Sequence, residues 1–316
     1  MSPTQPSLFP QGGWDCHHHI FEPDTFPYHP DRHLTPPPAT IAQYHAFRSR
    51  LGITHSVLTQ GLSYGDDNAS LRAFIPRLGP RATIAAIAVI DPAPHQTRDH
   101  DLRALHDAGV RGIRVNLYRF GAMDDAQRTR ELLLSHARRV APLGGCWSLT
   151  LTTAHAGFWD VLAPAVARVA REDGVRVVTD HFALLKGASM LGATETGHGG
   201  HVATQPGFSA VMRLVREGHL WVKLSAPYRV SEQGPDYGDV EVLVRALVEA
   251  NRERVVWGSD WPHTPRMKVR TREEAMREAA YLEVDDERWL RSLRSWLSDE
   301  EWDLLMVRNP SQLFGR

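Results

Sequence analysis

The hydrophobic residues of this chain recur in two alternating patterns. Short runs of apolar and β-branched residues, typical of buried strands, are followed by a polar turn and then by the 3.6-residue period of an amphipathic helix. We expect strands at 14–21, 55–60, 83–90, 110–118, 146–152, 175–181, 220–226 and 255–259. We expect helices at 40–51, 98–108, 126–140, 158–171, 209–217 and 239–251, with a less regular segment at 68–78 that contains Pro76.

Eight strands that mostly alternate with helices are the pattern of a (β/α)8, or TIM, barrel. The run Ile-Ala-Ala-Ile-Ala-Val-Ile at 84–90 is apolar throughout, as expected for a parallel strand covered on both faces. An open, doubly wound α/β sheet is the alternative, but no glycine-rich phosphate-binding fingerprint follows the first strand. We therefore expect an α/β protein with a single barrel domain over 1–316 and the barrel core at 14–265.

Two segments fall outside the repeating pattern. Residues 182–206 form a long, glycine-rich insertion, which is either a lid or binding loop or a floppy connection without a role. Residues 266–316 contain charged, Trp-bearing segments that predict extra C-terminal helices. Ser298 and Glu301 have the spacing of a capping box for the last of them.

Composition narrows the class of protein. The 316 residues are 42% hydrophobic and 23% charged, and the formal net charge of −1 gives no electrostatic footprint for nucleic acid. Two cysteines cannot build a disulfide framework, no apolar run approaches the roughly 18 residues of a membrane span, and the N-terminus lacks a secretory pattern. We expect a cytoplasmic protein without nucleic-acid or membrane partners. The Trp-rich C-terminal helices could support a homodimer.

The strongest chemical signal is the segment Asp-Cys-His-His-His at 15–19 in the first strand. Alternation along a strand places His17 and His19 on one face and His18 on the other. Two imidazoles at the mouth of a barrel can together hold a metal ion or polarise a carbonyl oxygen. Histidines satisfied by hydrogen bonds in the core are the alternative interpretation. Cys16 is expected to be a buried thiol.

Two further strand ends add catalytic side chains to the same rim. The strand at 255–259 runs into Asp260, where a carboxylate can take a proton from water, although a turn aspartate is an alternative. In a closed barrel the first and eighth strands are neighbours, so we expect Asp260 near His17 and His19. His181 follows the sixth strand and supplies another imidazole.

Cations at strand ends indicate an acidic substrate. Arg114, Lys223 and Arg229 lie at or just after strands, and an unpaired lysine inside an apolar strand would be costly to bury. Structural pairing with the nearby aspartates is the alternative. Tyr64, which follows the second strand, could also line the mouth. The Gly-x-Ser-x-Gly pattern around Ser63 lacks the immediate helix that a serine-hydrolase elbow requires, so we do not expect Ser63 to be a nucleophile.

Taken in order, these motifs resemble the amidohydrolase superfamily, in particular its amidohydrolase-related branch of 2-pyrone-4,6-dicarboxylate lactonase-like enzymes. The resemblance rests on Asp-x-His-x-His at 15–19, Tyr-Gly-x-Asp-Asn at 64–68, Arg-Gly-Ile-Arg-Val-Asn at 111–116, Asp-His at 180–181, Trp-Val-Lys-Leu-Ser at 221–225 and Gly-Ser-Asp-Trp-Pro-His at 258–263. It runs from residue 15 to the Asn-Pro-Ser-Gln-Leu-Phe-Gly segment at 309–315.

The resemblance implies a distorted barrel that hydrolyses a lactone or a similar cyclic ester. Asp260 would then be the general base, and His17, His19 and His181 would polarise the carbonyl group and stabilise the oxyanion. The substrate-binding residues that we expect are Tyr64, Arg114, Lys223, Arg229 and His263. The fifth strand lacks the terminal histidine of metal-dependent members, since the nearest is His155 past the strand end, which favours a metal-independent mode.

Two alternatives to a metal-independent lactonase stay open. The first is a decarboxylase of an aromatic or muconic-type acid that requires one divalent metal, zinc or manganese, held by His17, His19 and Asp260. The second is a barrel that binds a small acid without turning it over. Because the residues after His181 depart from the pattern of the lactonase, we expect a less acidic or bulkier ring than the pyrone dicarboxylate.

Overall fold

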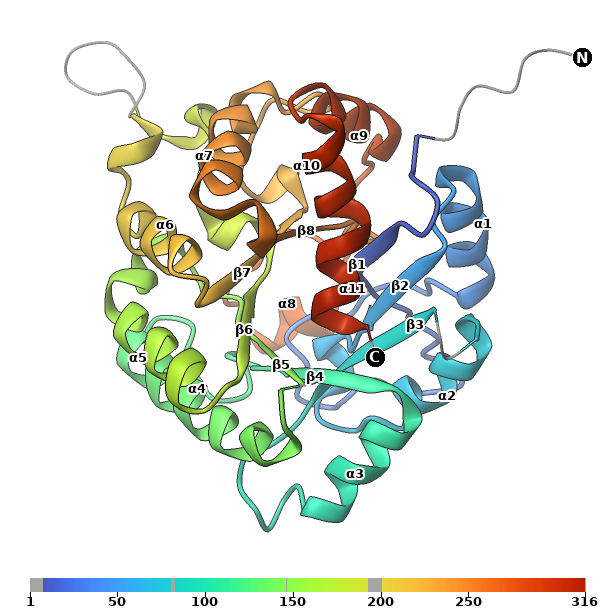
Figure 1. Cartoon of the computed structure of the whole chain (residues 1–316). Helices are drawn as coiled ribbons and strands as arrows, with labels where there is room; N and C mark the ends of the chain where they lie inside the picture. Colours follow the sequence, from blue (N-terminus) through green and yellow to red (C-terminus); the bar gives the residue numbers. More distant parts are fainter. Residues whose placement is uncertain (1–7, 81–82, 146, 193–200, 316) are drawn as a thin grey trace, which may run out of the picture.

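Eight parallel strands form the centre of the molecule, each hydrogen-bonded to the next in chain order. The computed structural model describes residues 8–80, 83–145, 147–192 and 201–315. Figure 1 shows the strands gathered in the middle with helices around them. The strands are β1 Trp14–His18, β2 His55–Thr59, β3 Ile84–Val89, β4 Val110–Arg114, β5 Ser148–Thr150, β6 Arg176–Thr179, β7 Leu220–Ser225 and β8 Val255–Gly258. The predicted distorted TIM barrel is confirmed.

The barrel closes where the chain leaves β8 and passes β1. The Asp260 backbone N–H donates to the His17 carbonyl oxygen at 2.8 Å, and the His19 N–H donates to the Trp261 carbonyl oxygen at 2.8 Å. Both bonds lie beyond the end of β8, so closure occurs at the carboxyl-terminal mouth. This geometry joins the start and the end of the barrel at the residues that carry the candidate chemistry.

Helices cover the outside of the strands. They are α1 Ile41–Leu51, α2 Ala69–Leu78, α3 Asp99–Ala108, α4 Ala126–Val140, α5 Trp159–Glu172, α6 Phe208–Arg216 and α7 Glu241–Asn251. The apolar faces of α1 and α3 bury leucine, isoleucine and aromatic side chains, and Gly52 and Gly109 end these two helices in the left-handed conformation. The helices therefore match the expected segments closely, including the less regular α2.

The last of the extra C-terminal helices, α11 Asn309–Phe314, closes the amino-terminal end of the barrel. The others are α8 Arg272–Met276, α9 Asp286–Ser295, α10 Asp299–Asp303 and a π-helical turn at Leu304–Arg308. Leu313 and Phe314 of α11 pack with Trp14 in a buried cluster, and Arg176 at the start of β6 donates to the Gln312 and Leu313 carbonyl oxygens at 2.9 Å. Figure 1 shows α11 beside β1 and β2.

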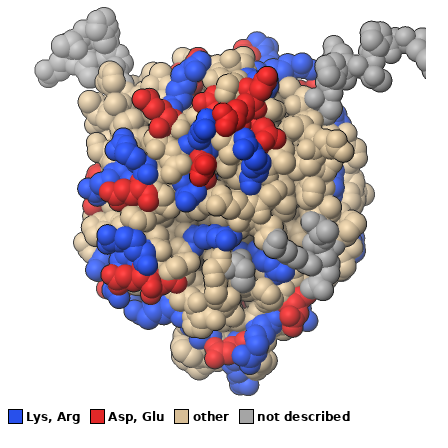
Figure 2. Space-filling view, viewed as in Figure 1, with Lys and Arg blue, Asp and Glu red and all other residues tan. Residues whose placement is uncertain are grey.

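Two expectations about the C-terminal segment have clear outcomes. The capping box is confirmed, because the Ser298 hydroxyl accepts from the Glu301 N–H and the Glu301 carboxylate accepts from the Ser298 N–H. Trp289 and Trp302 are buried within the chain, so these two rings are not the apolar contact surface that could support a homodimer. Figure 2 shows both signs of charge interspersed on the face drawn there, without a large basic area.

The strands end earlier at the mouth than the hydrophobic pattern predicts. β1, β4 and β6 stop at His18, Arg114 and Thr179, because the residues that follow leave the ladder to form loops. The first residue of the strand expected at 146–152 lies outside the described residues. No helix in the described parts of the chain is long and apolar enough to cross a membrane.

The predicted insertion begins as part of the core. His181, Phe182, Ala183 and Leu184 all have φ between +53° and +58°, a left-handed turn that is rare for residues other than glycine. Phe182 and Ala183 are fully buried. Residues 193–200 of the insertion lie outside the described residues. The described remainder, 182–192 and 201–206, does not line the catalytic pocket.

Candidate active site

The two histidines predicted for the first strand face the same space, next to an irregularity in that strand. The pairing of β1 with β2 is irregular between Asp15 and His18, and such a bulge re-aims a side chain. His17 and His19 line the pocket, whereas His18 is buried and stacks on Tyr44 with ring centroids 3.7 Å apart. The two-face prediction for these three histidines agrees with this geometry.

Gly258 packs directly against His17 and leaves the space that His17 occupies. A Cβ atom at Gly258 would lie 2.7 Å from the His17 Cβ and 2.9 Å from the His17 backbone nitrogen, which is closer than real Cβ contacts allow. The absence of a side chain at the end of β8 therefore allows β1 and β8 to approach where the imidazole enters the barrel. This is a packing role for glycine that needs no unusual backbone angle.

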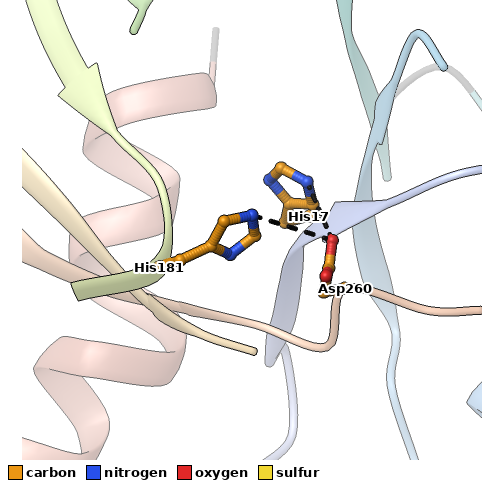
Figure 3. Close-up of side chains that lie close together, drawn as sticks. All are labelled: His17, His181 and Asp260. Atoms are coloured by element: carbon orange, nitrogen blue, oxygen red, sulfur yellow. Dashed lines mark ion pairs between the residues drawn. The ribbon is translucent and has the colours of Figure 1, made fainter. Parts of the chain in front are cut away.

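The two oxygens of Asp260 have different surroundings. Oδ2 accepts from the Tyr228 hydroxyl at 2.5 Å and from Arg229 Nη2 at 2.8 Å. Oδ1 faces three imidazoles, with His17, His19 and His181 Nε2 at 3.3, 3.7 and 4.0 Å. Figure 3 shows the ion-pair lines from His17 and His181 running to Asp260. One oxygen is thus anchored and the other is directed into the pocket.

The electrostatics keep this carboxylate ionised. Asp260 is 1% exposed, and its burial opposes the charged form. The Arg229 guanidinium and the imidazole contacts outweigh that penalty and hold the pKa of Asp260 well below its ordinary value of 3.8. Asp260 also has φ +60°, which is unusual for a non-glycine residue and is found where a site imposes the conformation.

The imidazoles of His19 and His181 are neutral, and each is held in place through its Nδ1 atom, which faces away from the pocket. His19 Nδ1 donates to the Thr59 carbonyl oxygen at 2.7 Å, and burial lowers the pKa of His19 to about 4. His181 Nδ1 lies 2.9 Å from the Ser225 hydroxyl, and burial lowers the pKa of His181 well below 6.5. Because both rings are held from outside the pocket, their Nε2 atoms point inward.

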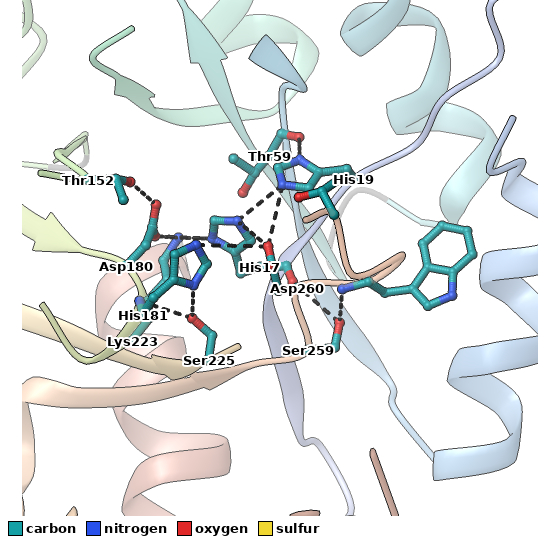
Figure 4. Close-up of polar contacts among 12 residues, drawn as sticks. His17, His19, Thr59, Thr152, Asp180, His181, Lys223, Ser225, Ser259 and Asp260 are labelled. Carbon is teal, nitrogen blue, oxygen red and sulfur yellow. Dashed lines mark hydrogen bonds and ion pairs between the residues drawn. The ribbon is translucent and has the colours of Figure 1, made fainter. Parts of the chain in front are cut away.

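A buried ion pair lies behind His17. Asp180 Oδ1 is 3.1 Å and Lys223 Nζ 3.2 Å from His17 Nδ1, and the two charged groups are 3.0 Å apart. Thr152 donates to Asp180 Oδ2 at 2.6 Å. Figure 4 shows this pair on one side of the His17 ring, with Asp260 and His19 on the other. Lys223 and Asp180 are both fully buried.

The pocket is small and bordered by three arginines. It leaves about 60 Å³ of space, and Arg114, Arg229 and Arg270 are among its lining residues. Arg114 is 6% exposed, and its Nε has no hydrogen-bond partner among the described residues. Arg270 donates only to the backbone oxygens of Arg266 and Lys268, so it has no carboxylate partner in the described parts of the chain.

A second cavity adjoins the first. It leaves about 540 Å³ of space and shares His33, Leu62 and Tyr118 with the lining of the inner pocket. The rings of His33 and Tyr118 stack with centroids 3.9 Å apart, and burial lowers the pKa of His33 to about 3. Arg32 and Arg119 border the outer cavity. The stacked pair is therefore the boundary between the two spaces.

The structure places the predicted substrate-binding residues differently. Arg114 and Arg229 line the pocket, but Arg229 is engaged by Asp260, Thr264 and the Pro265 carbonyl oxygen. Lys223 lies behind His17 and not in the lining. The position of Lys223 therefore favours structural pairing with Asp180 over direct contact with the substrate.

Tyr64, His263 and Ser63 have structural partners. The Tyr64 hydroxyl accepts from the Glu22 N–H at 2.9 Å, and His263 Nε2 lies 3.3 Å from Asp286 Oδ1. Neither residue lines the catalytic pocket. The Ser63 hydroxyl donates to the Leu34 carbonyl oxygen at 2.8 Å, as expected for a residue that is not a nucleophile.

Sequence reasoning missed three residues of the site. Tyr228 anchors Asp260, Arg270 lines the pocket, and Asp180, named above only within a motif, contacts His17 Nδ1. Tyr228 directly precedes the predicted Arg229, so its position after β7 was a usable signal. Arg270 follows β8 by 12 residues in a loop whose course no periodicity reveals.

The donor set at the centre suits a divalent metal ion. His17, His181 and Asp260 each offer a ligand atom, and these atoms lie within 4.8 Å of one another. Imidazole nitrogen and carboxylate oxygen are ordinary ligands of zinc and manganese. This group differs from the expected set by having His181 in place of His19. His155 is exposed and outside the group, so substrate or water would complete the coordination.

The family assignment follows from the comparison with known families. The family model described as amidohydrolase matches residues 14–316. The chain belongs to the amidohydrolase family. It is therefore an enzyme, and the expected membership of this superfamily is confirmed. Members of the family often use a metal, which agrees in kind with the His and Asp donors described above.

Two relatives of this amidohydrolase are named as hydrolases. A 4-sulfomuconolactone hydrolase of Hydrogenophaga intermedia is 28% identical over 98% of this chain and 90% of its own. A 2-pyrone-4,6-dicarboxylate hydrolase of Comamonas testosteroni is 31% identical over 84% of this chain and 82% of its own. A crystal structure from Agrobacterium tumefaciens shares the fold, with a TM-score of 0.73 and 24% identity over 98% and 97% of the two chains.

Proposed function

We propose that this amidohydrolase opens a lactone that carries a carboxylate or another anionic group, with water as the nucleophile. The observation that supports this most is the asymmetry of Asp260. Its Oδ2 is held by Tyr228 and Arg229, and its Oδ1 is directed at the imidazoles of His17, His19 and His181. The names of the hydrolase relatives give the substrate class.

Asp260 is the general base of the proposed reaction. A water molecule near Oδ1 gives up a proton to the carboxylate as its oxygen attacks the lactone carbonyl carbon. The pKa of Asp260 is low, so the group is ionised across the neutral range, and the bonds to Tyr228 and Arg229 fix its orientation. The ring C–O bond then breaks, and the proton on Asp260 passes to the leaving oxygen.

His17 and His181 stabilise the developing oxyanion, whereas neutral His19, which donates its Nδ1 hydrogen to the Thr59 carbonyl oxygen, presents an acceptor at Nε2. His19 and His181 are neutral at neutral pH, and His17 lies between them and the buried Lys223. Preorganised hydrogen-bond donors directed at the position where negative charge develops are an effective form of catalysis in a water-poor pocket. A divalent ion held by His17, His181 and Asp260 would, when bound, supply Lewis-acid polarisation of the carbonyl oxygen.

Arg114 and Arg270 bind the anionic group of the substrate. Both line the pocket, and neither is fully engaged by carboxylates in the described parts of the chain. A guanidinium with free N–H groups matches the geometry of a carboxylate or sulfonate. Arg229 then has a different role from the one expected, because its nitrogens hold Asp260 and the loop at 264–265.

The outer cavity fits the part of the substrate away from the reacting ester. The inner space of about 60 Å³ holds the reacting group, and the adjoining space of about 540 Å³ begins at His33 and Tyr118. A stacked imidazole and phenol ring present a flat surface to an unsaturated ring. We therefore propose a substrate with a conjugated ring or side arm that extends past this pair.

The test is turnover of a panel of lactones in H₂¹⁸O. The panel contains 2-pyrone-4,6-dicarboxylate, 4-sulfomuconolactone, an uncharged pyrone and the methyl esters of the acids. We expect consumption of at least one anionic lactone, with one ¹⁸O atom in the new carboxylate and weaker activity on the esters. No turnover of any anionic lactone by the folded protein, or a preference for the esters, would contradict the proposal.

A metal-dependent decarboxylase is the second candidate, favoured by the group of His17, His181 and Asp260 as possible ligands. It predicts stoichiometric zinc or manganese in active protein and release of CO₂ from an aromatic or muconic-type acid. Elemental analysis and a CO₂ assay on the same preparation separate the two candidates. CO₂ release that stops on chelation and returns with metal would favour the decarboxylase over the lactonase.

A further inference from the structure

His17 Nδ1 has two opposite partners. It lies 3.1 Å from Asp180 Oδ1, which accepts hydrogen bonds, and 3.2 Å from Lys223 Nζ, which donates them. All three groups are fully buried, so water does not replace either partner. A neutral imidazole has one N–H and one lone pair. The choice of partner at Nδ1 therefore decides which nitrogen of His17 carries the hydrogen.

The pocket side of the ring restricts this choice. His19 gives its Nδ1 hydrogen to the Thr59 carbonyl oxygen, so its Nε2 is an acceptor in the neutral ring. His17 Nε2 lies 3.2 Å from that atom and 3.3 Å from Asp260 Oδ1, which is a second acceptor. A hydrogen on His17 Nε2 can be donated to these acceptors. A lone pair there would instead face the lone pairs of His19 Nε2 and Asp260 Oδ1, which is unfavourable.

The two tautomers have different chemistry. With hydrogen on Nε2, Lys223 donates to Nδ1 and His17 is a hydrogen-bond donor toward the reacting carbonyl oxygen. With hydrogen on Nδ1, Asp180 accepts it and Nε2 offers a lone pair to a metal ion, which is the usual carboxylate-histidine-metal arrangement. The same imidazole can thus serve a metal-free or a metal-dependent site, depending on the group behind it.

We propose that the buried Lys223–Asp180 pair selects the tautomer of His17, with Lys223 holding it as the Nε2–H donor and Asp180 favouring the metal-binding form. Lys223 is in this view a positioning residue that acts through His17. Figure 4 shows the geometry, with the pair behind the ring and Asp260 and His19 in front of it. The inference does not depend on the identity of the substrate.

The first readout is the tautomer itself. Ring ¹⁵N shifts of histidine-labelled protein distinguish Nδ1–H from Nε2–H, and the signals of His17 are identified by their loss in His17→Gln. We expect Nε2–H in the natural protein and a shift toward Nδ1–H in Lys223→Met, which keeps an unbranched side chain one atom shorter and removes the donor. Nδ1–H in the natural protein, or no change in Lys223→Met, would overturn the proposal.

The second readout is zinc affinity, measured by competition with a chromophoric chelator. Lys223→Met should bind zinc about tenfold more tightly than the natural protein, because Asp180 alone then faces Nδ1. Asp180→Asn should bind about 10–100-fold more weakly, the usual effect of losing such a partner. His155→Gln, an exposed position outside the donor group, is the control for adventitious binding.

The opposite changes in zinc affinity expected for Lys223→Met and Asp180→Asn distinguish this role from structural damage. A substitution that only loosens the site lowers zinc affinity in both variants, which would contradict the proposal. If Lys223→Met fails to fold, as judged by circular dichroism, the proposal still requires Asp180→Asn to weaken zinc binding and to retain Nε2–H. Unchanged or tighter binding in Asp180→Asn would overturn it. Neither readout uses lactone turnover, so the outcome is independent of the proposed function.

Discussion

The two ends of the barrel are built on different principles. At the amino-terminal end, Trp14, Leu313 and Phe314 form a dry, apolar contact between β1 and α11. At the carboxyl-terminal mouth, Asp260 and His181 have left-handed backbone angles and are surrounded by charged groups. The first end is stabilised by burial of apolar area, and the second holds polar groups in positions that burial alone would disfavour. Stability and chemistry are therefore separated along the barrel axis.

This separation predicts that the largest change in stability comes from the end without chemistry. Leu313→Ala removes a fully buried side chain and leaves a cavity, which costs about 2–5 kcal/mol. Urea unfolding measures the loss, and kcat of the remaining folded enzyme should stay within about twofold. A large fall in kcat with unchanged stability would show that the two ends are coupled.

At the mouth, Gly258→Ala should produce the opposite outcome. A methyl group there would meet the Cβ and backbone of His17, which must move by a few tenths of an ångström or more. Small displacements of a catalytic group can cost about 10²-fold in rate. Gly238→Ala is the matched control, since a Cβ there meets nothing within 4 Å. Equal kcat in the two variants would contradict the close approach of β8 to His17.

The mouth should also make the protein sensitive to acid. The folded pKa of His19 is about 4, below the ordinary 6.5, so between these values the unfolded chain binds a proton that the native state does not. Because of His19, the free energy of unfolding is highest above pH 6.5 and falls as the pH is lowered, by about 2 kcal/mol at pH 5.

Urea unfolding at pH 7 and pH 5 checks this. His19→Gln should lose about 2 kcal/mol less than the natural protein over the same interval. His155→Gln, at an exposed position, should lose as much as the natural protein. The same pH dependence in all three proteins would place the acid sensitivity elsewhere.

The smallest of these effects concerns Arg270. Arg270→Gln removes a cation from the pocket lining and should raise KM for an anionic lactone about tenfold, with kcat changed little. Arg272→Gln, an exposed residue paired with Asp31, is the control. An equal effect on the neutral methyl ester would show that Arg270 does not recognise charge.

The sequence predicts the strands and helices of the barrel well, but it predicts the loops and side-chain directions at the mouth poorly, for a physical reason. The helices and strands follow from apolar periodicity, which is local, and the closure of β1 on β8 follows from the strand count. The direction of Lys223 does not, because the same strand parity fits both a mouth residue and a partner of Asp180. Arg270 and the His33–Tyr118 pair depend on the course of long loops, where no periodic pattern applies.

The central claim is that the pocket-facing oxygen of Asp260, Oδ1, activates water. The most direct measurement is kcat of Asp260→Asn on an anionic lactone that the natural enzyme opens, with Asp236→Asn as the same chemical change in a half-exposed ion pair with Arg288. We expect a loss of about 10²–10⁴-fold for Asp260→Asn and none for Asp236→Asn, with both proteins folded. Full activity in folded Asp260→Asn would contradict the account.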